Sequence, residues 1–321
     1  MASVLEHKLL VLTGKGGVGK TTVSAALGLL AADRGLRTIV VEVGDQRRLA
    51  ELFGAGTEDE TEDAGSEIEL RQNLWSISID PDRALLEWLQ AIGGRVSGRV
   101  LASSGTFQYF AAAAPGAKEL VSMVKIWKLT EGERGARRRP GRYDLVILDA
   151  PATGHALGML HSPQTFGAIA RVGPIASQTG QVSELLSDPA RSAYLAVAQP
   201  TEMAVTEALE IQDGLQRQLG RDLHTVVVNG TLPRRFSAAE ISRFDGLAGS
   251  DSVTPASANH SVTRSAALAA RAVHNRASFQ HNQVARLRRR HFEVLPVPFL
   301  FVPELDLAAV EWIAEHLSKQ L

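Results

Sequence analysis

The stretch Gly14-Lys15-Gly16-Gly17-Val18-Gly19-Lys20-Thr21-Thr22 decides the fold of this chain. It fits the spacing G-x-x-x-x-G-K-[ST], with an apolar run before it at residues 8–13 and a helical pattern after it at about 20–34. Glycines let consecutive backbone N–H groups turn inward without side-chain clashes, and the N-terminus of the following helix adds a positive dipole. The stretch therefore predicts a phosphate-binding loop between a strand and a helix.

Side chains of this loop have specific expected roles. Lys20 is expected to reach the β- and γ-phosphates of a nucleotide as a catalytic cation, and the Thr21 hydroxyl is expected to ligate Mg²⁺. Thr22 is expected to donate to the α-phosphate. The preceding residues are expected to surround the phosphates: Gly14, Lys15, Gly16, Gly17, Val18 and Gly19. The loop thus predicts the binding of ATP together with Mg²⁺.

Apolar runs recur along the chain, and most of them precede a helical or glycine-rich stretch. They lie at residues 8–13, 38–43, 74–79, 144–149, 193–198, 225–229 and 292–297. Continuous apolar strands that alternate with helices are typical of a parallel sheet covered on both faces. We therefore predict an α/β fold, a doubly wound and mostly parallel P-loop sheet in a single domain over residues 1–321. Helical stretches at about 81–130 and 156–192 are expected to form an α-helical subdomain inserted in it.

Composition excludes several classes of protein. The 321 residues include 34 Lys+Arg and 35 Asp+Glu, and the net charge of −1 argues against a general polyanion binder, so no nucleic acid partner is expected. The absence of cysteine excludes disulfides, thiolate zinc sites, iron–sulfur clusters and cysteine nucleophiles. The N-terminus lacks the features of a signal peptide, and no apolar run approaches the ~18–20 residues that span a bilayer. We expect a soluble, cytoplasmic protein.

A second segment, residues 143–157, supplies a further metal ligand. Residues 145–148 are apolar and are followed by Asp149, which predicts a strand with an aspartate at its carboxyl end. At that place a carboxylate can hold Mg²⁺ through water. The next residues are Ala150-Pro151-Ala152-Thr153-Gly154-His155-Ala156-Leu157.

Two motifs carry a resemblance to a known family. The loop G-K-G-G-V-G-K-T-T, with its extra Lys15, resembles the deviant Walker motif of the class that includes the Min and Par positioning ATPases, nitrogenase iron protein and arsenical-pump ATPases. The segment A-P-A-T-G-H-A-L at 150–157 resembles switch II, D-T-A-P-T-G-H-T-L, of the arsenical-pump and tail-anchored-protein-targeting ATPases. Further likeness lies at residues 109–120, 199–207, 226–229 and 296–299, so the resemblance extends over most of the chain.

This resemblance implies roles near the phosphates. Lys15 would act catalytically across an ATP-bound dimer and touch the partner's phosphates, in the place of an arginine finger. The alternative is that Lys15 contacts only its own nucleotide or solvent. Switch II would reorganise when the γ-phosphate is present and would pass that change to the helical region. Its residues are Pro151, Thr153, Gly154 and His155.

The resemblance also implies contacts with the base. Asn229, at the end of the apolar run 225–229, would read the adenine edge; the alternative is a simple cap of the strand end. The late proline-rich loop, with Pro298 and Phe299, would close over the base.

Switch I departs from the family pattern. The family reads D-P-A-H-x-L after its second strand, and its aspartate positions the attacking water. Aligning Leu49 and Phe53 with the family leucine and phenylalanine places Gly44 at the aspartate position, with Asp45 one residue further on. Three alternatives follow: Asp45 takes the catalytic role through a shifted loop, hydrolysis is impaired, or a related partner subunit supplies the missing group.

The family resemblance implies a Mg²⁺-dependent ATPase, a homodimer or a heterodimer with a paralogue, that couples nucleotide state to a protein client or membrane partner. The lack of cysteine removes thiolate arsenite binding and a zinc-clamped dimer. One apolar set could line a client groove or belong to the core: Phe107, Phe110, Val121, Met123, Val124, Ile126 and Trp127. Two alternatives are a hydrolytically weak regulatory subunit beside a catalytic paralogue, and a Min/Par-type positioning ATPase with residues 310–321 as its membrane tail.

Overall fold

The apolar run before the phosphate loop forms strand β1 (Leu9–Thr13), which is buried along its whole length. It pairs in parallel with β5 (Leu145–Asp149) on one side and with β6 (Ser192–Ala198) on the other. The computed structural model describes residues 4–44, 47–55, 65–92, 116–131, 143–169, 172–249 and 258–321. Within these residues β1 belongs to an eight-stranded sheet of order β3-β4-β2-β5-β1-β6-β7-β8.

The other strands extend this sheet to both sides. Beyond β5 lie β2 (Thr38–Val43), β4 (Leu74–Ile79) and β3 (Ile68–Arg71), and beyond β6 lie β7 (Thr225–Thr231) and β8 (Glu293–Pro298). All these neighbours pair in parallel except β3, which is antiparallel to β4. The predicted α/β class is therefore confirmed. The edge strand β3 was not predicted, because its four residues alternate between apolar and charged over too short a length to be distinguished from a loop.

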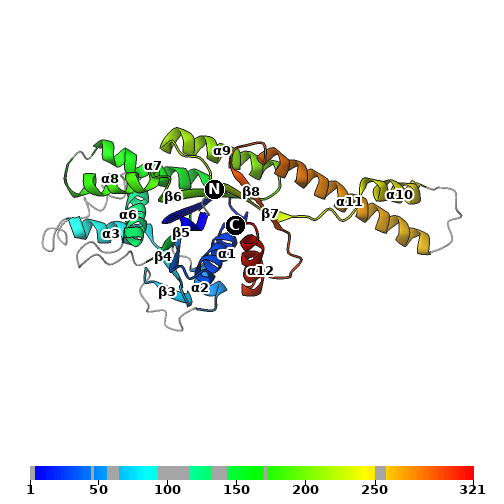
Figure 1. Cartoon of the computed structure of the whole chain (residues 1–321), viewed down its shortest axis with the longest axis horizontal. Helices are drawn as coiled ribbons and strands as arrows, with labels where there is room; N and C mark the ends of the chain where they lie inside the picture. Colours follow the sequence, from blue (N-terminus) through cyan, green and yellow to red (C-terminus); the bar gives the residue numbers. More distant parts are fainter. Residues whose placement is uncertain are drawn as a thin grey trace.

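Helices cover both faces of the sheet, as the doubly wound prediction requires. Figure 1 shows α1 (Lys20–Asp33) and α12 (Leu307–Ser318) on one side, with the short α2 (Arg48–Leu52) beside them. On the other side lie α7 (Thr153–Ile169) and α9 (Glu202–Leu219). A short 3₁₀ helix, Val4–Glu6, precedes β1.

The C-terminal helix is part of the packed core. α12 packs against α1, and its apolar residues Val310, Ile313 and Leu317 are buried. The interpretation of residues 310–321 as a membrane tail is therefore wrong, since the apolar face that such a tail needs is already covered. Among the described helices, none is long and apolar enough to cross a membrane.

Four helices pack on one another at one end of the sheet: α3 (Pro81–Ile92), α6 (Ala117–Glu131), α7 and α8 (Gly173–Ser187). The Trp88 indole N–H of α3 donates to Gln178 Oε1 of α8 at 2.6 Å, and the Lys118 ammonium of α6 lies 2.6 Å from the Asp82 carboxylate of α3. α3 and α8 lie inside the two stretches expected to be helical, while α6 ends one residue after the first and α7 begins three residues before the second. Side-chain contacts join helices from both stretches.

The apolar residues that could line a client groove have two different outcomes: some lie in the core, and others lie outside the described residues. Five of its members on α6 are at most 9% exposed: Val121, Met123, Val124, Ile126 and Trp127. For these residues the core alternative is correct, because side chains that already pack inside the protein offer no open surface to a client. Phe107 and Phe110 lie outside the described residues.

A two-helix arm projects from the opposite end of the molecule. It consists of α10 (Ala238–Gly249) and the long α11 (Ala258–Leu287), which pack on each other. Figure 1 shows the arm extending away from the sheet. α11 contacts β7, β8 and α9, so the arm is attached to the sheet at this edge.

The contact between α1 and the sheet depends on a glycine. A Cβ atom added at Gly28 would lie 2.9 Å from Val40 Cγ2 and 3.0 Å from Leu74 Cδ1, both in the buried face of the sheet. We predict that Gly28→Ala lowers the free energy of unfolding by about 1–3 kcal/mol, because overpacking displaces strands β2 and β4. Denaturant unfolding followed by circular dichroism measures the change.

Gly158→Ala is the matched control for this test. Gly158 is an exposed helical glycine of α7, and a Cβ atom there would meet nothing within 4 Å. It should raise the free energy of unfolding by up to ~1 kcal/mol through helix propensity alone. Equal effects of the two substitutions would contradict the packing argument.

Candidate nucleotide-binding site

The loop between β1 and α1 approaches the neighbouring strands so closely that only glycine fits at two positions. Gly14 has φ +149°, and a Cβ atom there would lie 2.2 Å from the Val197 carbonyl oxygen of β6. Gly19 has φ +94°, and its Cβ atom would lie 2.3 Å from Asn229 Nδ2 of β7. These conformations and distances exclude L side chains. The loop is therefore held against the carboxyl ends of β6 and β7.

Lys20, the first residue of α1, folds back across this loop. Its ammonium donates to the carbonyl oxygens of Gly14 at 3.1 Å and Lys15 at 3.2 Å. Burial lowers the pKa of Lys20 below its usual range, and the carboxylates of Asp149 and Glu207 oppose that shift. The charged end of Lys20 is thus directed into the concave side of the loop.

Lys15 has a different orientation. Its ammonium contacts the sulfur of Met203, at the start of α9. Met203 is 66% exposed, so this contact lies on the surface of the protein. The two lysines of the loop therefore separate: Lys20 points inward and Lys15 points outward.

Thr21 and Asp149 form a pair of oxygen ligands beside the loop. The Thr21 hydroxyl donates to Asp149 Oδ2 at 2.6 Å, while Asp149 Oδ1 is buried and has no hydrogen-bond partner. Burial raises the pKa of Asp149, and the Thr21 hydroxyl and the Lys20 charge oppose that shift. An unpartnered buried carboxylate oxygen next to a hydroxyl fits a hard divalent cation such as Mg²⁺, which prefers oxygen ligands. In the described part of the chain, no group of three His, Cys, Asp or Glu residues offers an alternative metal site.

The residues expected to form switch II begin α7. Thr153 donates through its hydroxyl to Glu207 Oε1 of α9 at 2.6 Å. Gly154 and His155 are exposed, and Pro151 is partly buried between β5 and the helix. Thr153 therefore links the end of β5 directly to α9.

A groove of about 1040 Å³ lies next to this link, between α7 and α9. Its lining includes Thr153, Gly154 and Leu157 from α7 and the carboxylates Glu202, Glu207 and Glu210 from α9. Because Met203 also lines the groove, it begins where Lys15 reaches the surface.

The residues expected to contact a base gather at the carboxyl ends of β7 and β8. Asn229 Nδ2 donates to the Val18 carbonyl oxygen of the phosphate loop at 3.0 Å, so the side chain is joined to the loop instead of capping its own strand. Pro298 ends β8, and Phe299, which follows it, is 48% exposed. Sequence reasoning missed Phe301, whose ring centroid lies 4.9 Å from that of Phe299, and Arg235, whose guanidinium lies 5.3 Å from the Phe301 ring.

Gly44 directly follows β2 and has no side chain. Its backbone N–H donates to the Ile79 carbonyl oxygen at 2.9 Å, and the Ser78 hydroxyl donates to the Gly44 carbonyl oxygen at 2.7 Å. The expected catalytic residue Asp45 lies outside the described residues. The described part of this segment therefore ends with the backbone of Gly44 fixed to the neighbouring strand.

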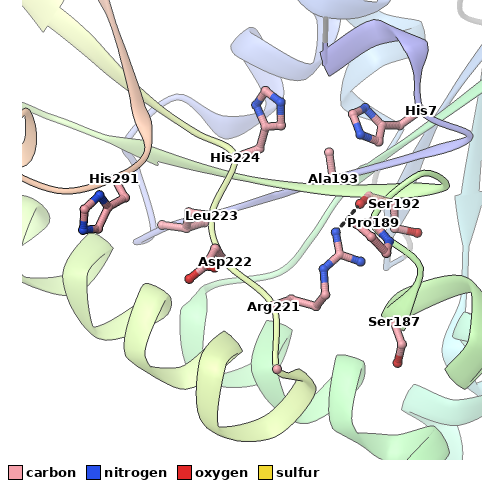
Figure 2. Close-up of a pocket in the computed structure, with 11 residues that line it drawn as sticks. His7, Ser187, Pro189, Ser192, Ala193, Arg221, Asp222, Leu223, His224 and His291 are labelled. Carbon is pink, nitrogen blue, oxygen red and sulfur yellow. Dashed lines mark hydrogen bonds between the residues drawn. The ribbon is translucent and has the colours of Figure 1, made fainter. Parts of the chain in front are cut away.

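A separate pocket lies at the opposite, amino ends of β6 and β7. It has a volume of about 550 Å³, and its lining includes His7, Arg221, His224 and His291. Figure 2 shows Arg221 directed at Ser192, whose carbonyl oxygen it contacts at 2.7 Å, and it also donates to the Leu186 carbonyl oxygen. Because its guanidinium donates to these backbone carbonyls, Arg221 ties the segment after α9 to the end of α8 and the start of β6. The pocket lies at the opposite end of the strands from the phosphate loop.

Comparison with known proteins agrees with this geometry. The model of a family described as anion-transporting ATPase matches residues 7–173, which is more than half of the chain. The chain is 28% identical over 253 residues to the ATPase BagA of Mycobacterium tuberculosis, covering 77% of this chain and 72% of that protein. It is 29% identical over 170 residues to the ATPase ASNA1 homolog 1 of Paramecium tetraurelia, covering 51% of this chain and 46% of that protein.

The contact between Gly19 and Asn229 gives a prediction about the stability of the protein. We expect Gly19→Ala to lower the free energy of unfolding by about 2 kcal/mol or more, through its positive φ and the collision with Asn229. Asn229→Ala alone removes one hydrogen bond and should cost about 1 kcal/mol. The double variant should cost less than the sum, because Asn229→Ala also removes the collision.

Gly16→Ala serves as the control within the same loop, since a Cβ atom there would meet nothing within 4 Å. Its free energy of unfolding should stay close to that of the wild type. Denaturant unfolding of the four variants measures the coupling. Strict additivity of the Gly19 and Asn229 substitutions would contradict the contact.

Proposed function

The chain belongs to the anion-transporting ATPase family and is an ATP-hydrolysing enzyme, and from that premise we propose that it is a Mg²⁺-dependent dimeric switch. In this proposal the switch couples its nucleotide state to the binding of a protein client or membrane partner, and it works in the cytoplasm. The observation that carries the proposal is the arrangement of Lys20 inside the loop, with the Thr21–Asp149 pair at its side.

Nucleotide phosphates would occupy the concave side of the loop. The Lys20 ammonium, held by the Gly14 and Lys15 carbonyl oxygens, would exchange these partners for oxygens of the β- and γ-phosphates. Backbone N–H groups of residues 14–19 and the Thr22 hydroxyl would contact the remaining phosphate oxygens. Desolvation of Lys20 favours this exchange, because a partly buried ammonium gains more from an anion than an exposed one does.

The metal would be held by the Thr21 hydroxyl and, through water, by Asp149. When bound, Mg²⁺ neutralises charge on the β- and γ-phosphates and orients the γ-phosphate. The chain's own contribution is to fix the position of these oxygen atoms, because the Thr21–Asp149 hydrogen bond aligns them and Asp149 Oδ1 has no protein partner that competes for it.

Lys15 would supply charge to the nucleotide of a second subunit. Its ammonium lies on the surface, against the exposed Met203, and is therefore available to a partner. In a dimer that closes around nucleotide, this lysine would stabilise the negative charge that develops on the transferred phosphoryl group. The partner is a second copy or a paralogue.

The nucleotide signal would leave the site through Thr153. A γ-phosphate near residues 151–155 would compete for the Thr153 hydroxyl, which now donates to Glu207 of α9. Release of this bond would change the groove between α7 and α9 and the helices packed on α7. We propose that the chain is a single ATPase domain and that α3, α6, α7 and α8 form the inserted helical subdomain that responds to nucleotide.

Gly44 favours a second candidate function. Since Gly44 has no side chain to hold the attacking water, Asp45 is the proposed substitute, one residue further on. If Asp45 holds the attacking water poorly, the chain would hydrolyse ATP weakly and act beside a catalytic paralogue. Steady-state phosphate release from the purified chain separates the two functions, and Asp45→Ala should abolish it if Asp45 holds the water.

We predict that Lys20→Ala and Asp149→Asn each lower ATP turnover by at least about 100-fold, because the first removes a cation from the phosphates and the second weakens the hold on Mg²⁺. Lys20→Ala should also weaken ATP binding, and chelation of Mg²⁺ by EDTA should stop turnover of the wild type. Phosphate release and titration with a fluorescent ATP analogue measure these effects. Lys319→Ala, at an exposed position directly after α12, is the control. Normal binding and turnover by Lys20→Ala would overturn the proposal.

The dimer gives a separate prediction. With ATP and Mg²⁺, light scattering should report about twice the 34.4 kDa mass of one chain, or a complex with a paralogue. Lys15→Ala should keep ATP affinity within about threefold and lower turnover at least about tenfold, because its contact forms across the dimer. Lys15→Arg should recover part of the turnover. Normal turnover by a monomeric Lys15→Ala variant would contradict the role across subunits.

A further inference from the structure

Strand β2 carries a carboxyl group that the proposed mechanism leaves unused. Glu42 lies two residues before Gly44 and is only 7% exposed. The preceding strand residues, Val40 and Val41, are aliphatic and fully buried. A buried carboxyl group costs free energy unless its surroundings satisfy it, so the groups that surround Glu42 indicate what it does there.

Glu42 joins two parts of the site. In the pairing of β2 with β5, Glu42 is the register partner of Asp149, and directly paired residues of neighbouring strands project from the same face of the sheet. From the other side, the backbone N–H of Leu49 donates to Glu42 Oε2 at 3.3 Å. Leu49 is buried in the first turn of α2. The Glu42 carboxyl therefore connects the strand pair that carries Asp149 to the start of α2.

Arg48 is the cation that this connection holds near the phosphate loop. It is the first residue of α2 and is exposed. Arg48 directly precedes Leu49, whose backbone N–H is bonded to Glu42, and Glu42 is paired in register with Asp149. Asp149 in turn accepts the hydroxyl of Thr21, so the start of α2 lies beside this part of the phosphate loop.

The hydrogen-bonding role of Glu42 does not require a full negative charge. Burial raises its pKa to about 7, the Asp149 carboxylate adds to that shift, and the backbone N–H groups of Leu49 and Arg48 oppose it. A protonated carboxyl group still has an oxygen that accepts the Leu49 N–H. The contact between β2 and α2 is therefore available in both protonation states.

We infer that Glu42 is a positioning residue that holds the first turn of α2 so that Arg48 contacts the terminal phosphate of ATP. Arg48 thereby supplies, from the same chain, a second cation beside Lys20. This inference rests on the proposed nucleotide site and adds a γ-phosphate contact to it. An arginine placed in this way favours ATP over ADP, because only ATP presents the terminal phosphate to it.

The experiment compares Glu42→Ala, Glu42→Gln, Arg48→Ala and the double variant Glu42→Ala/Arg48→Ala in the full chain. ATP and ADP affinities are measured with fluorescent analogues in the presence of Mg²⁺, and turnover is measured by phosphate release. Thermal unfolding checks that each variant folds. Glu51→Ala is the matched control, because Glu51 is an exposed carboxylate on the same helix.

We expect Arg48→Ala and Glu42→Ala each to weaken ATP affinity about tenfold and ADP affinity less than about twofold, the effect of losing one charged phosphate contact. Glu42→Gln should stay within about threefold of the wild type, because its amide oxygen still accepts the Leu49 N–H. The double variant should be no weaker than the weaker single variant, since both substitutions remove the same contact.

Three results would overturn the inference. The double variant could lose ATP affinity by the product of the two single effects, the variants could lose ATP and ADP affinity equally, or Glu42→Gln could bind ATP as weakly as Glu42→Ala. A failure of the proposed function would give a different result from a failure of this inference. A wild type that binds ATP without hydrolysing it removes the catalytic part of that function, while the coupling between Glu42 and Arg48 is still read from ATP affinity.

Discussion

The close approach of the phosphate loop to β6 and β7 constrains the whole nucleotide end of this molecule. A side chain at Gly14 would collide with the Val197 carbonyl oxygen, and one at Gly19 with the Asn229 amide. The backbone of the phosphate loop therefore lies directly against the backbone of β6 and the side-chain amide of Asn229. As a result, the loop, the strand that continues into Asn229 and the first turn of α1 have a fixed mutual position. The inward direction of Lys20 follows from that arrangement, because the loop carbonyls accept its ammonium.

The sequence predicts those parts of the fold that local patterns encode. Buried strands such as β1 and β5 are continuous apolar runs, so the parallel sheet and the position of Asp149 could be derived from them. The edge strand β3 is short and alternating, and its pairing is decided by β4, a neighbour that no local pattern indicates. The C-terminal helix could be predicted from the sequence, but its packing partner could not. Only the tertiary structure shows that its apolar face covers α1 and not a membrane.

The candidate site, like the fold, could be predicted from the sequence only in part. Lys20, Thr21 and Asp149 lie in motifs whose spacing carries the chemistry, and the structure brings them together. Glu42 and Arg235 have no such spacing. A glutamate at the end of an apolar strand resembles an ordinary solvent-facing terminus until the register places it opposite Asp149 and the start of α2 covers it. Charge that becomes buried only through tertiary contacts cannot be distinguished from surface charge in a single sequence.

The arm formed by α10 and α11 gives the molecule an unusual mechanical property. α11 has 30 residues, and at 1.5 Å per residue it is about 45 Å long. Its inner end rests on β7, the strand that bonds to the phosphate loop through Asn229. A tilt of about 5° at that seat would move the far tip by about 4 Å, by the geometry of a rigid helix of that length. A small rotation of α11 at this seat would therefore be amplified along the helix into a displacement of several ångströms at its far end.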